Sequence, residues 1–156
     1  MKVAIGTDHG AIAYKANIIE YLEDKGFEVV DCGTDSDASC DYPDFAKTVA
    51  DKIVSGQADF GILMCGTGIG MSLAANKVKG IRAAVVPNVD YARLSKEHNN
   101  ANIICLSGRF MTLQDCKDCI DAYINAKFAG ELNDESAQRH KRRVSKISQI
   151  ENENFK

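Results

Sequence analysis

The stretch FGILMCGTGIGMSLAANK, residues 60–77, predicts a buried strand that passes through a glycine loop into a helix. Its first six residues, one glycine among them, form an apolar run of the kind found in strands of parallel sheets. Glycine then occupies every second position from Gly66 to Gly70, and a helix-forming segment follows from Met71. This order places the thiol of Cys65 where a strand ends and a helix begins, which makes the junction the first candidate for a functional site.

The rest of the chain repeats this alternation of short apolar runs and amphipathic segments. Further strands are expected at 2–7, 27–33, 81–86 and 102–108, in addition to 60–66. Helices are expected at 11–26, 43–56, 71–80, 90–100 and 112–130, and the polar tail is expected to be helical from about residue 136. Strands that alternate with helices indicate βαβ units, so we predict an α/β fold, a three-layer Rossmann-like sandwich with a five-stranded parallel sheet.

The composition bounds the class of protein. A chain of 156 residues with 45% hydrophobic content fits a single domain over residues 1–156, with a helical tail from about residue 135. No apolar run approaches the roughly 18 residues of a membrane span, and no signal-peptide pattern opens the chain, so we expect a cytoplasmic protein with reduced cysteines. The net charge of −3 argues against nucleic-acid binding, although basic residues crowd the segment RHKRRVSK, residues 139–146. Any site that binds an anion is therefore expected to be a small group of residues and not a broad basic surface.

Polar residues follow the ends of most predicted strands. Ligands of doubly wound sheets bind outside the carboxyl ends of the strands, so these residues are the candidates for a site. They are Asp8 and His9 after the first strand, Tyr42 in the loop 33–44 after the second, Cys65–Gly70 after the third, and Ser107–Arg109 after the fifth. The helix after the fourth strand ends in Glu97–Asn100, which adds His98 and Asn99 to the set.

The glycine loop excludes two common nucleotide-binding motifs. Its pattern is G-x-G-x-G with Met71 in the sixth position, which misses the dinucleotide fingerprint, and no G-x-x-x-x-G-K-[ST] motif occurs. Backbone amides that converge at a helix N-terminus can still stabilise an anion. The loop is therefore either an oxyanion site or a purely structural tight turn.

Cys65 bears on that choice. A thiol at a helix N-terminus is more readily ionised than a free one, so Cys65 can serve as a base or as a nucleophile. A cysteine phosphatase would need an arginine six positions later, where this chain has Met71. The remaining alternative is a buried apolar cysteine that ends a core strand.

Five segments together make the chain resemble the type B ribose-5-phosphate isomerases, a sugar-phosphate isomerase family that also includes galactose-6-phosphate isomerase subunits. They are GTDHGA, DYPDFA, CGTGIGMSLAANKVKGIRAA, LSKEHNNANIICLSGR and AQRHKRRV, and the resemblance covers nearly the whole chain. It implies that ribose 5-phosphate and ribulose 5-phosphate interconvert through a cis-enediolate, with no cofactor, metal or nucleotide. Members that lack the cysteine use a carboxylate at the position of Met71, so this chain falls in the cysteine-dependent group.

The resemblance also implies roles for individual residues. Cys65 would be the base that moves a proton between C1 and C2, and His98 the acid that opens the sugar ring with help from Thr67. The remaining residues would bind substrate: the enediolate by Gly66, Gly68, Ile69 and Gly70, the phosphate by His9, Arg109, Arg139 and Arg143, and the sugar by Asp8, Tyr42 and Asn99. Family members are dimers with active sites between subunits, so the chain is expected to form a homodimer or a dimer of dimers whose tail arginines reach a neighbour's site.

Several alternatives stay open. The same loop and arginines would suit a non-catalytic sugar-phosphate-binding domain, and the substrate could be a hexose 6-phosphate, allose or galactose. RHKRR could be a solvated basic face, and Asp8 could simply cap the next turn. The pair Cys116-x-x-Cys119 lies in a helical pattern without a second half, and the three histidines are far apart, so no metal site is expected.

Overall fold

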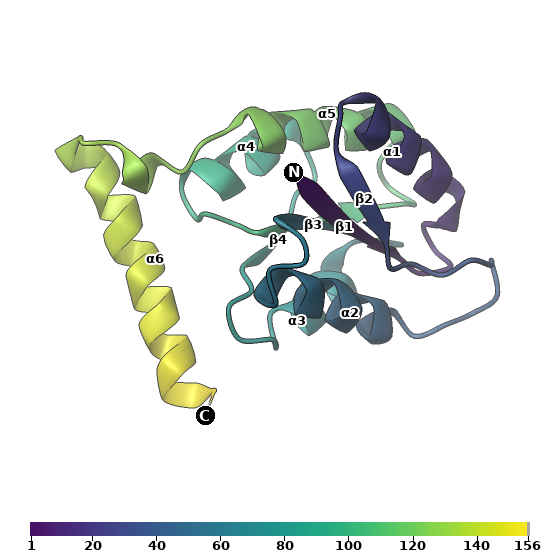
Figure 1. Ribbon diagram of the computed structural model, residues 1–156, viewed down its shortest axis with the longest axis horizontal. Coiled ribbons are helices and arrows are strands. Elements are labelled where there is room, and N and C mark those ends of the chain that lie inside the picture. The colour runs from purple at the N-terminus through teal and green to yellow at the C-terminus, as the bar shows by residue number, and fades with distance from the viewer. Residues whose placement is uncertain (156) are drawn as a thin grey trace.

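The computed structural model, which describes residues 1–155, contains a five-stranded parallel sheet in the order β2-β1-β3-β5-β4 (Figure 1). The strands are β1 (Lys2–Thr7), β2 (Glu28–Asp31), β3 (Phe60–Cys65), β4 (Ala83–Val85) and β5 (Ile103–Ser107). Each lies within its predicted segment. The central strand is the apolar run from which the sequence argument began, because β3 pairs with β1 on one side and β5 on the other.

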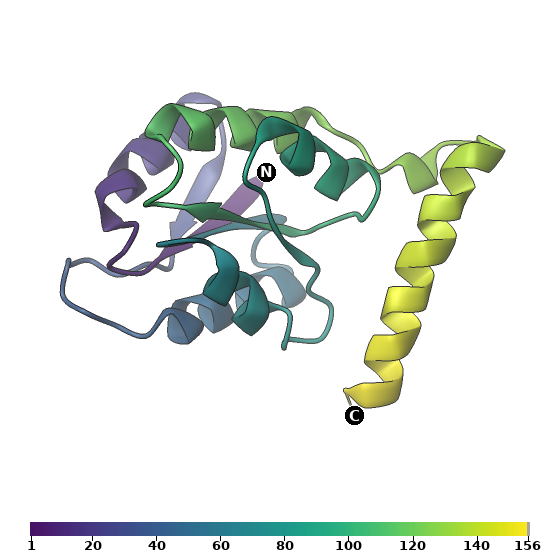
Figure 2. The same ribbon diagram turned by 180° about the vertical axis from the view of Figure 1, so that it is seen from behind.

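Helices cover both faces of the sheet. They are α1 (Ile12–Asp24), α2 (Tyr42–Val54), α3 (Ile69–Ala75), α4 (Val89–Glu97), α5 (Leu113–Asn125) and α6 (Glu135–Asn154), with a short 3₁₀ turn, η1 (Ala129–Glu131). Figures 1 and 2 show α1, α4 and α5 on one face and α2 and α3 on the other. The predicted three-layer α/β sandwich is therefore confirmed.

Successive side chains of β3 supply two separate cores. Ile62 and Met64 pack with the helices of the α1 face, while Leu63 and Cys65 pack with α2 and α3. A strand buried on both faces must be apolar throughout, which is why β3 shows no polar alternation.

The cysteine pair of α5 belongs to the first core, as the sequence predicted. Cys116 and Cys119 are fully buried in the apolar cluster on the α1 face. Burial raises the pKa of the Cys119 thiol to about 11 and that of Cys116 to about 12. Both thiols are therefore packing groups.

The third helix is shorter than expected because Asn76 ends it. The Asn76 side chain donates to the carbonyl oxygen of Ala83 at 2.9 Å and accepts from the Ala83 amide at 2.8 Å. This pair turns the chain from α3 toward β4, so α3 stops at Ala75 although the helical pattern runs to residue 80.

The tail helix α6 stands apart from the sandwich (Figures 1 and 2). It begins at Glu135, one residue before the predicted start, where the Asp134 side chain accepts from the Ser136 amide at 3.0 Å. Near its other end the Glu151 carboxylate accepts from the Gly80 amide at 2.7 Å. Within residues 1–155, no helix combines the length and the apolar character that a membrane crossing would need.

Candidate active site

Three loops meet at the carboxyl edge of the sheet. The Asp8 amide donates to the carbonyl of Met64 at 3.2 Å, and the Gly108 amide donates to the carbonyl of Cys65 at 2.8 Å. A Cβ atom at Gly10 would lie 3.0 Å from the Gly66 nitrogen. The loops after β1, β3 and β5 therefore touch one another, as expected for neighbouring parallel strands.

Cys65 lies under the glycine loop and is 5% exposed. The Gly68 amide donates to its sulfur at 3.1 Å. Gly68 has a φ of 83°, a left-handed conformation that suits glycine and turns this amide back toward the thiol. The Cys65 sulfur therefore has a polar partner in the glycine loop, which a purely apolar core cysteine would not have.

The β5 end fixes the shape of the glycine loop. The Ser107 hydroxyl donates to the Gly66 carbonyl at 2.6 Å and accepts from the Phe110 amide at 2.9 Å. The Arg109 amide also donates to the Gly66 carbonyl, at 3.2 Å. The sequence marked Ser107 only as a strand end, and its role as an anchor of the loop becomes visible only in the pairing of Cys65 with Ser107 across β3 and β5.

Two side chains lie directly over loop glycines. A Cβ atom on Gly66 would approach Arg109 to 3.2 Å, and one on Gly70 would approach the Tyr42 ring to 2.5 Å. Arg109 is exposed and forms no ion pair in the described part of the chain. A cation without a carboxylate partner over backbone amides is suited to hold an anion.

The loop before Tyr42 orients His9. The Cys40 amide donates to His9 Nδ1 at 3.2 Å. Because Nδ1 then accepts, the hydrogen of the neutral ring lies on Nε2, which is free to donate to a ligand. The neighbouring Asp8 caps the turn, since its Oδ1 accepts from the Gly10 amide at 2.8 Å, and its predicted role toward a sugar stays a prediction.

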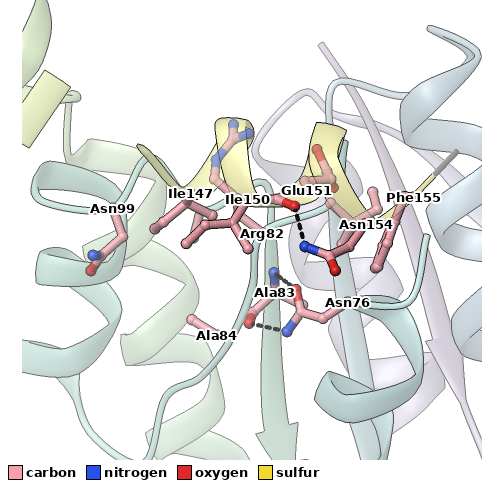
Figure 3. A pocket seen from close by; sticks show the side chains of 12 residues that line it. Asn76, Arg82, Ala83, Ala84, Asn99, Ile147, Ile150, Glu151, Asn154 and Phe155 are labelled. Carbon is pink, nitrogen blue, oxygen red and sulfur yellow. Dashed lines mark hydrogen bonds between the residues drawn. The ribbon is translucent and has the colours of Figure 1, made fainter. Parts of the chain in front are cut away.

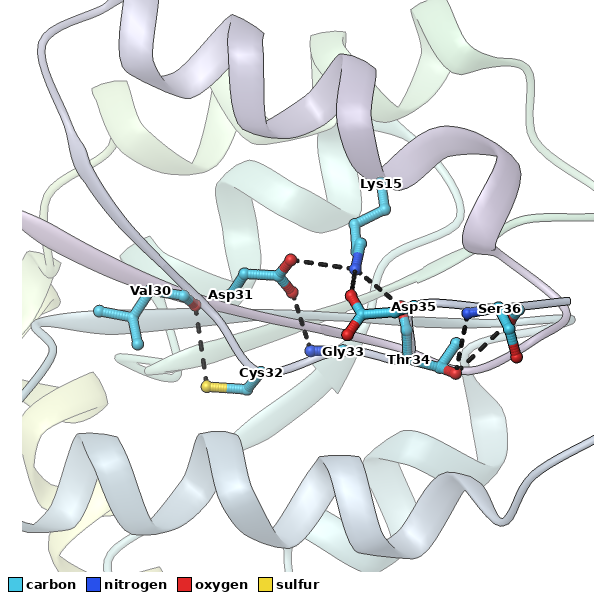
Figure 4. A network of polar contacts seen from close by, with 8 residues as sticks. All are labelled: Lys15, Val30, Asp31, Cys32, Gly33, Thr34, Asp35 and Ser36. Carbon is cyan, nitrogen blue, oxygen red and sulfur yellow. Dashed lines mark hydrogen bonds and ion pairs between the residues drawn. The ribbon is translucent and has the colours of Figure 1, made fainter. Parts of the chain in front are cut away.

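A buried lysine anchors the other end of that loop (Figure 4). Lys15 is 8% exposed, and its ammonium lies 3.0 Å from both Asp31 and Asp35 and donates to the Thr34 carbonyl at 2.7 Å. Burial alone would lower the pKa of Lys15, but the hydrogen bonds and charges of the two aspartates outweigh it and raise the pKa. On the sequence, Lys15 looks like an ordinary solvated residue of a helix.

The structure does not bring all the predicted site residues together. His98 and Asn99 follow α4, which runs back across the sheet, and they precede β5, whereas Cys65 pairs with the last residue of β5. The length of β5 alone separates the two edges by roughly 13 Å, at 3.3 Å per residue. The expectation that His98 and Asn99 join the strand-end residues is therefore not met within one chain.

Two clusters result, which we name for their positions. The loop cluster lies at the carboxyl edge and consists of Asp8, His9, Tyr42, Cys65, Gly66, Thr67, Gly68, Ile69, Gly70 and Arg109. The helix cluster lies at the amino edge and consists of His98, Asn99, Arg139 and Arg143. The ring of His140, next to Arg139 on α6, stacks on His98 and ties α6 to the end of α4. Both arginines are exposed and form no ion pair among residues 1–155.

A groove of about 580 Å³ borders the helix cluster (Figure 3). Its walls come from α6 and from the segment around β4, with Ile147 and Ile150 on the α6 side and Ala84 and Asn99 on the other. Ile147 and Ile150 are both exposed beside this groove. The groove contains no residue of the loop cluster.

Comparisons with known proteins agree over almost the entire chain. Residues 3–147 match the sequence model of the family described as ribose/galactose isomerase. A probable ribose-5-phosphate isomerase B of Mycoplasma genitalium is 44% identical over 153 residues, which are 97% of this chain and 96% of the relative.

Solved structures extend the likeness to three dimensions. Ribose-5-phosphate isomerase B of Clostridium thermocellum superposes with a TM-score of 0.92 at 47% identity, covering 98% of this chain and 99% of the other. Ribose-5-phosphate isomerase B of Mycoplasma genitalium with bound ribulose-5-phosphate gives a TM-score of 0.89 at 44% identity, with 98% and 97% covered.

Proposed function

This chain belongs to the ribose/galactose isomerase family, and we propose that it interconverts ribose 5-phosphate and ribulose 5-phosphate through a cis-enediolate. The observation that carries the proposal is the loop cluster. In it the Cys65 sulfur accepts a hydrogen bond from the Gly68 amide, and Arg109, which has no ion pair among residues 1–155, lies over Gly66. The isomerase B structure with bound ribulose-5-phosphate, at 44% identity, supports the choice of substrate.

Cys65 is the base of the proposed reaction. Its thiolate takes the proton from C2 of the open-chain aldose and returns it to C1, while the C2 hydroxyl gives up a proton and O1 takes one. Negative charge develops on these oxygens in the enediolate, where the amides of Gly66–Gly70 and the Thr67 hydroxyl stabilise it more than they stabilise the substrate. The protons balance within this step, so it needs no oxidant, no reductant and no cofactor.

His98 is the acid that opens the sugar ring, with Thr67 assisting. It protonates the ring oxygen of the furanose as the C1 hydroxyl loses its proton, which frees the aldehyde. The phosphate is held by His9 and Arg109 from the loop cluster and by Arg139 and Arg143 from the helix cluster, while Asp8, Tyr42 and Asn99 bind the sugar.

The active site needs both clusters and therefore two chains. We place the loop cluster of one subunit against the helix cluster of its partner, in a homodimer with two equivalent sites. Leu73 of α3, near the loop cluster, is 64% exposed, and Ile150 of α6, beside the groove, is 61% exposed. The α6 groove would receive the α3 edge of the partner, which covers both apolar surfaces.

Two alternatives differ in a testable way. The family includes galactose isomerases, so a hexose 6-phosphate is the second candidate substrate. A domain that only binds sugar phosphates is the third, but such a domain has no use for a thiol under a glycine loop or for His98.

The test is turnover of purified protein with ribose 5-phosphate, allose 6-phosphate and galactose 6-phosphate in parallel, with a chelator present and without nucleotide. We expect ribose 5-phosphate to react fastest. Faster turnover of a hexose 6-phosphate would favour the second candidate. Binding of all three sugars without turnover would identify a binding domain.

A further inference from the structure

His140 makes a contact to which neither the sequence nor the proposed reaction assigns a role. Its ring stacks on that of His98 with the centroids 4.2 Å apart and the planes 8° from parallel. His140 is 7% exposed although it lies in the most charged stretch of α6. His98 itself is half-buried. A parallel imidazole pair between two separate helices is a specific contact, because the two rings are 42 residues apart in the chain.

The stack sets the plane of the His98 ring against that of His140. Catalytic histidines are usually oriented by a hydrogen bond to one ring nitrogen. In the described part of the chain, the side-chain hydrogen bonds and ion pairs near the end of α4 do not involve the His98 ring, whose face stacks on His140. Both ring nitrogens of His98 are thus left for substrate, while the plane of the ring is set from α6.

We propose that His140 is a positioning residue for ring opening, which holds the His98 imidazole in the plane from which it protonates the ring oxygen of the sugar. The inference rests on the proposed role of His98. If it holds, α6 carries His140, which orients the acid His98, and close beside it Arg139 and Arg143, which hold the phosphate. One helix then fixes the distance between the acid and the phosphate of the same substrate.

The surroundings of His140 disfavour a charge on its ring. Burial lowers its pKa first, and the charges of His98, Arg139 and Arg143 lower it further. A neutral ring can stack on His98 while His98 carries the proton, whereas two charged imidazoles would repel each other. A neutral aromatic ring should therefore be able to replace His140.

The experiment separates ring opening from proton transfer. Ribulose 5-phosphate has no furanose form, so exchange of its C1 hydrogen in D2O needs Cys65 but no ring step. For His140→Ala we expect the ratio of ribose 5-phosphate turnover to C1 exchange to fall about tenfold, part of the 10²–10⁴ that a general acid contributes. His140→Phe, which keeps a stacked ring, should recover most of the loss. Lys146→Ala, an exposed position on the same helix, is the matched control and should leave the ratio unchanged.

Two results would overturn the inference. One is an unchanged ratio in His140→Ala, and the other is an equal loss of turnover and exchange, which would indicate a merely structural role. His98→Ala separates this failure from that of the proposed function. If His98→Ala loses turnover but keeps exchange while His140→Ala behaves as wild type, only the inference fails. If His98→Ala also keeps its turnover, the ring-opening role itself is wrong.

Discussion

The loop cluster and the helix cluster are built in opposite ways. The loop cluster sits on the ends of three paired strands, and its thiol, glycine loop and His9 are all held by hydrogen bonds. The helix cluster depends on α6, which stands outside the sandwich and is tied to it by the histidine stack and by the bond from Gly80 to Glu151. The single chain therefore has a preformed loop cluster, whereas its helix cluster is positioned by a helix whose apolar side is exposed.

This difference predicts that the two clusters fail differently. A change in the loop cluster should alter chemistry and leave assembly intact. A change on the apolar side of α6 should alter assembly and remove activity as a consequence. The following substitutions test this division, from the largest expected effect to the smallest.

Cys65→Ala should have the largest effect, because it removes the proposed base. We expect at least a 10³-fold loss of ribose 5-phosphate turnover and an equal loss of C1 exchange in ribulose 5-phosphate. Phosphate binding, measured by calorimetry with ribose 5-phosphate, should remain within a few-fold of wild type. A variant that turns over like the wild type would remove Cys65 from the mechanism.

Ile150→Asp should break the helix cluster through assembly. The Ile150 side chain is exposed in the single chain. Burying an unpaired carboxylate at the proposed interface would cost about 1.4 kcal/mol or more, which is a factor of ten in the dimer dissociation constant. We expect sedimentation to show monomers at concentrations where the wild type is dimeric, with turnover falling in parallel. Ser145→Asp adds the same charge at an exposed position of α6 and is the control. Full activity of a monomeric Ile150→Asp would contradict the two-chain site.

Ser107→Ala should loosen the glycine loop. It removes the hydroxyl that bridges the Gly66 carbonyl and the Phe110 amide, a loss of about 1 kcal/mol in the free energy of unfolding. Because the loop amides would no longer be aimed at the enediolate, we expect turnover to fall about tenfold. Tyr123→Phe removes a buried hydroxyl that donates to the Ala101 carbonyl far from the loop, and should cost similar stability without lowering turnover. Equal turnover losses in both variants would indicate a general effect of stability.

Lys15→Met should have the smallest effect. The lysine is buried but Asp35 is exposed, so solvent screens the pair and we expect a loss of about 1 kcal/mol in unfolding free energy with a few-fold rise in KM. The pKa of Lys15 is raised in the folded protein, so its contribution is complete below its ordinary pKa of about 10.4 and is lost as the pH rises beyond the raised value. The difference between wild type and variant, measured by urea unfolding, should be constant from pH 7 to about pH 9. A difference that grows over this pH range would contradict the assignment of this stability to the charged form of Lys15.

The sequence predicted the sheet and the loop cluster well because both depend on local patterns. The apolar run of β3, the glycines after it and the polar residues at strand ends are visible without knowledge of distant contacts. The position of His98 was missed because it depends on the direction in which α4 returns across the sheet. The roles of Lys15, Ser107 and His140 could not be predicted for a different reason, since each acts through a partner at least 16 residues away. Their types alone indicate a solvated lysine, a strand-end serine and a basic tail.

The most direct test of the two-chain site is complementation between two inactive variants. Cys65→Ala and His98→Ala are purified separately, dissociated, mixed in equal amounts and reassociated, and the exchange of subunits is verified by mass. In the proposed dimer, half of the assemblies would then contain one chain of each variant. Each of these would have one intact site, because Cys65 of one chain would face His98 of the other. The account predicts that turnover of ribose 5-phosphate rises to about a quarter of the wild-type value. Mixed dimers without activity would show that Cys65 and His98 do not act on one substrate from different chains.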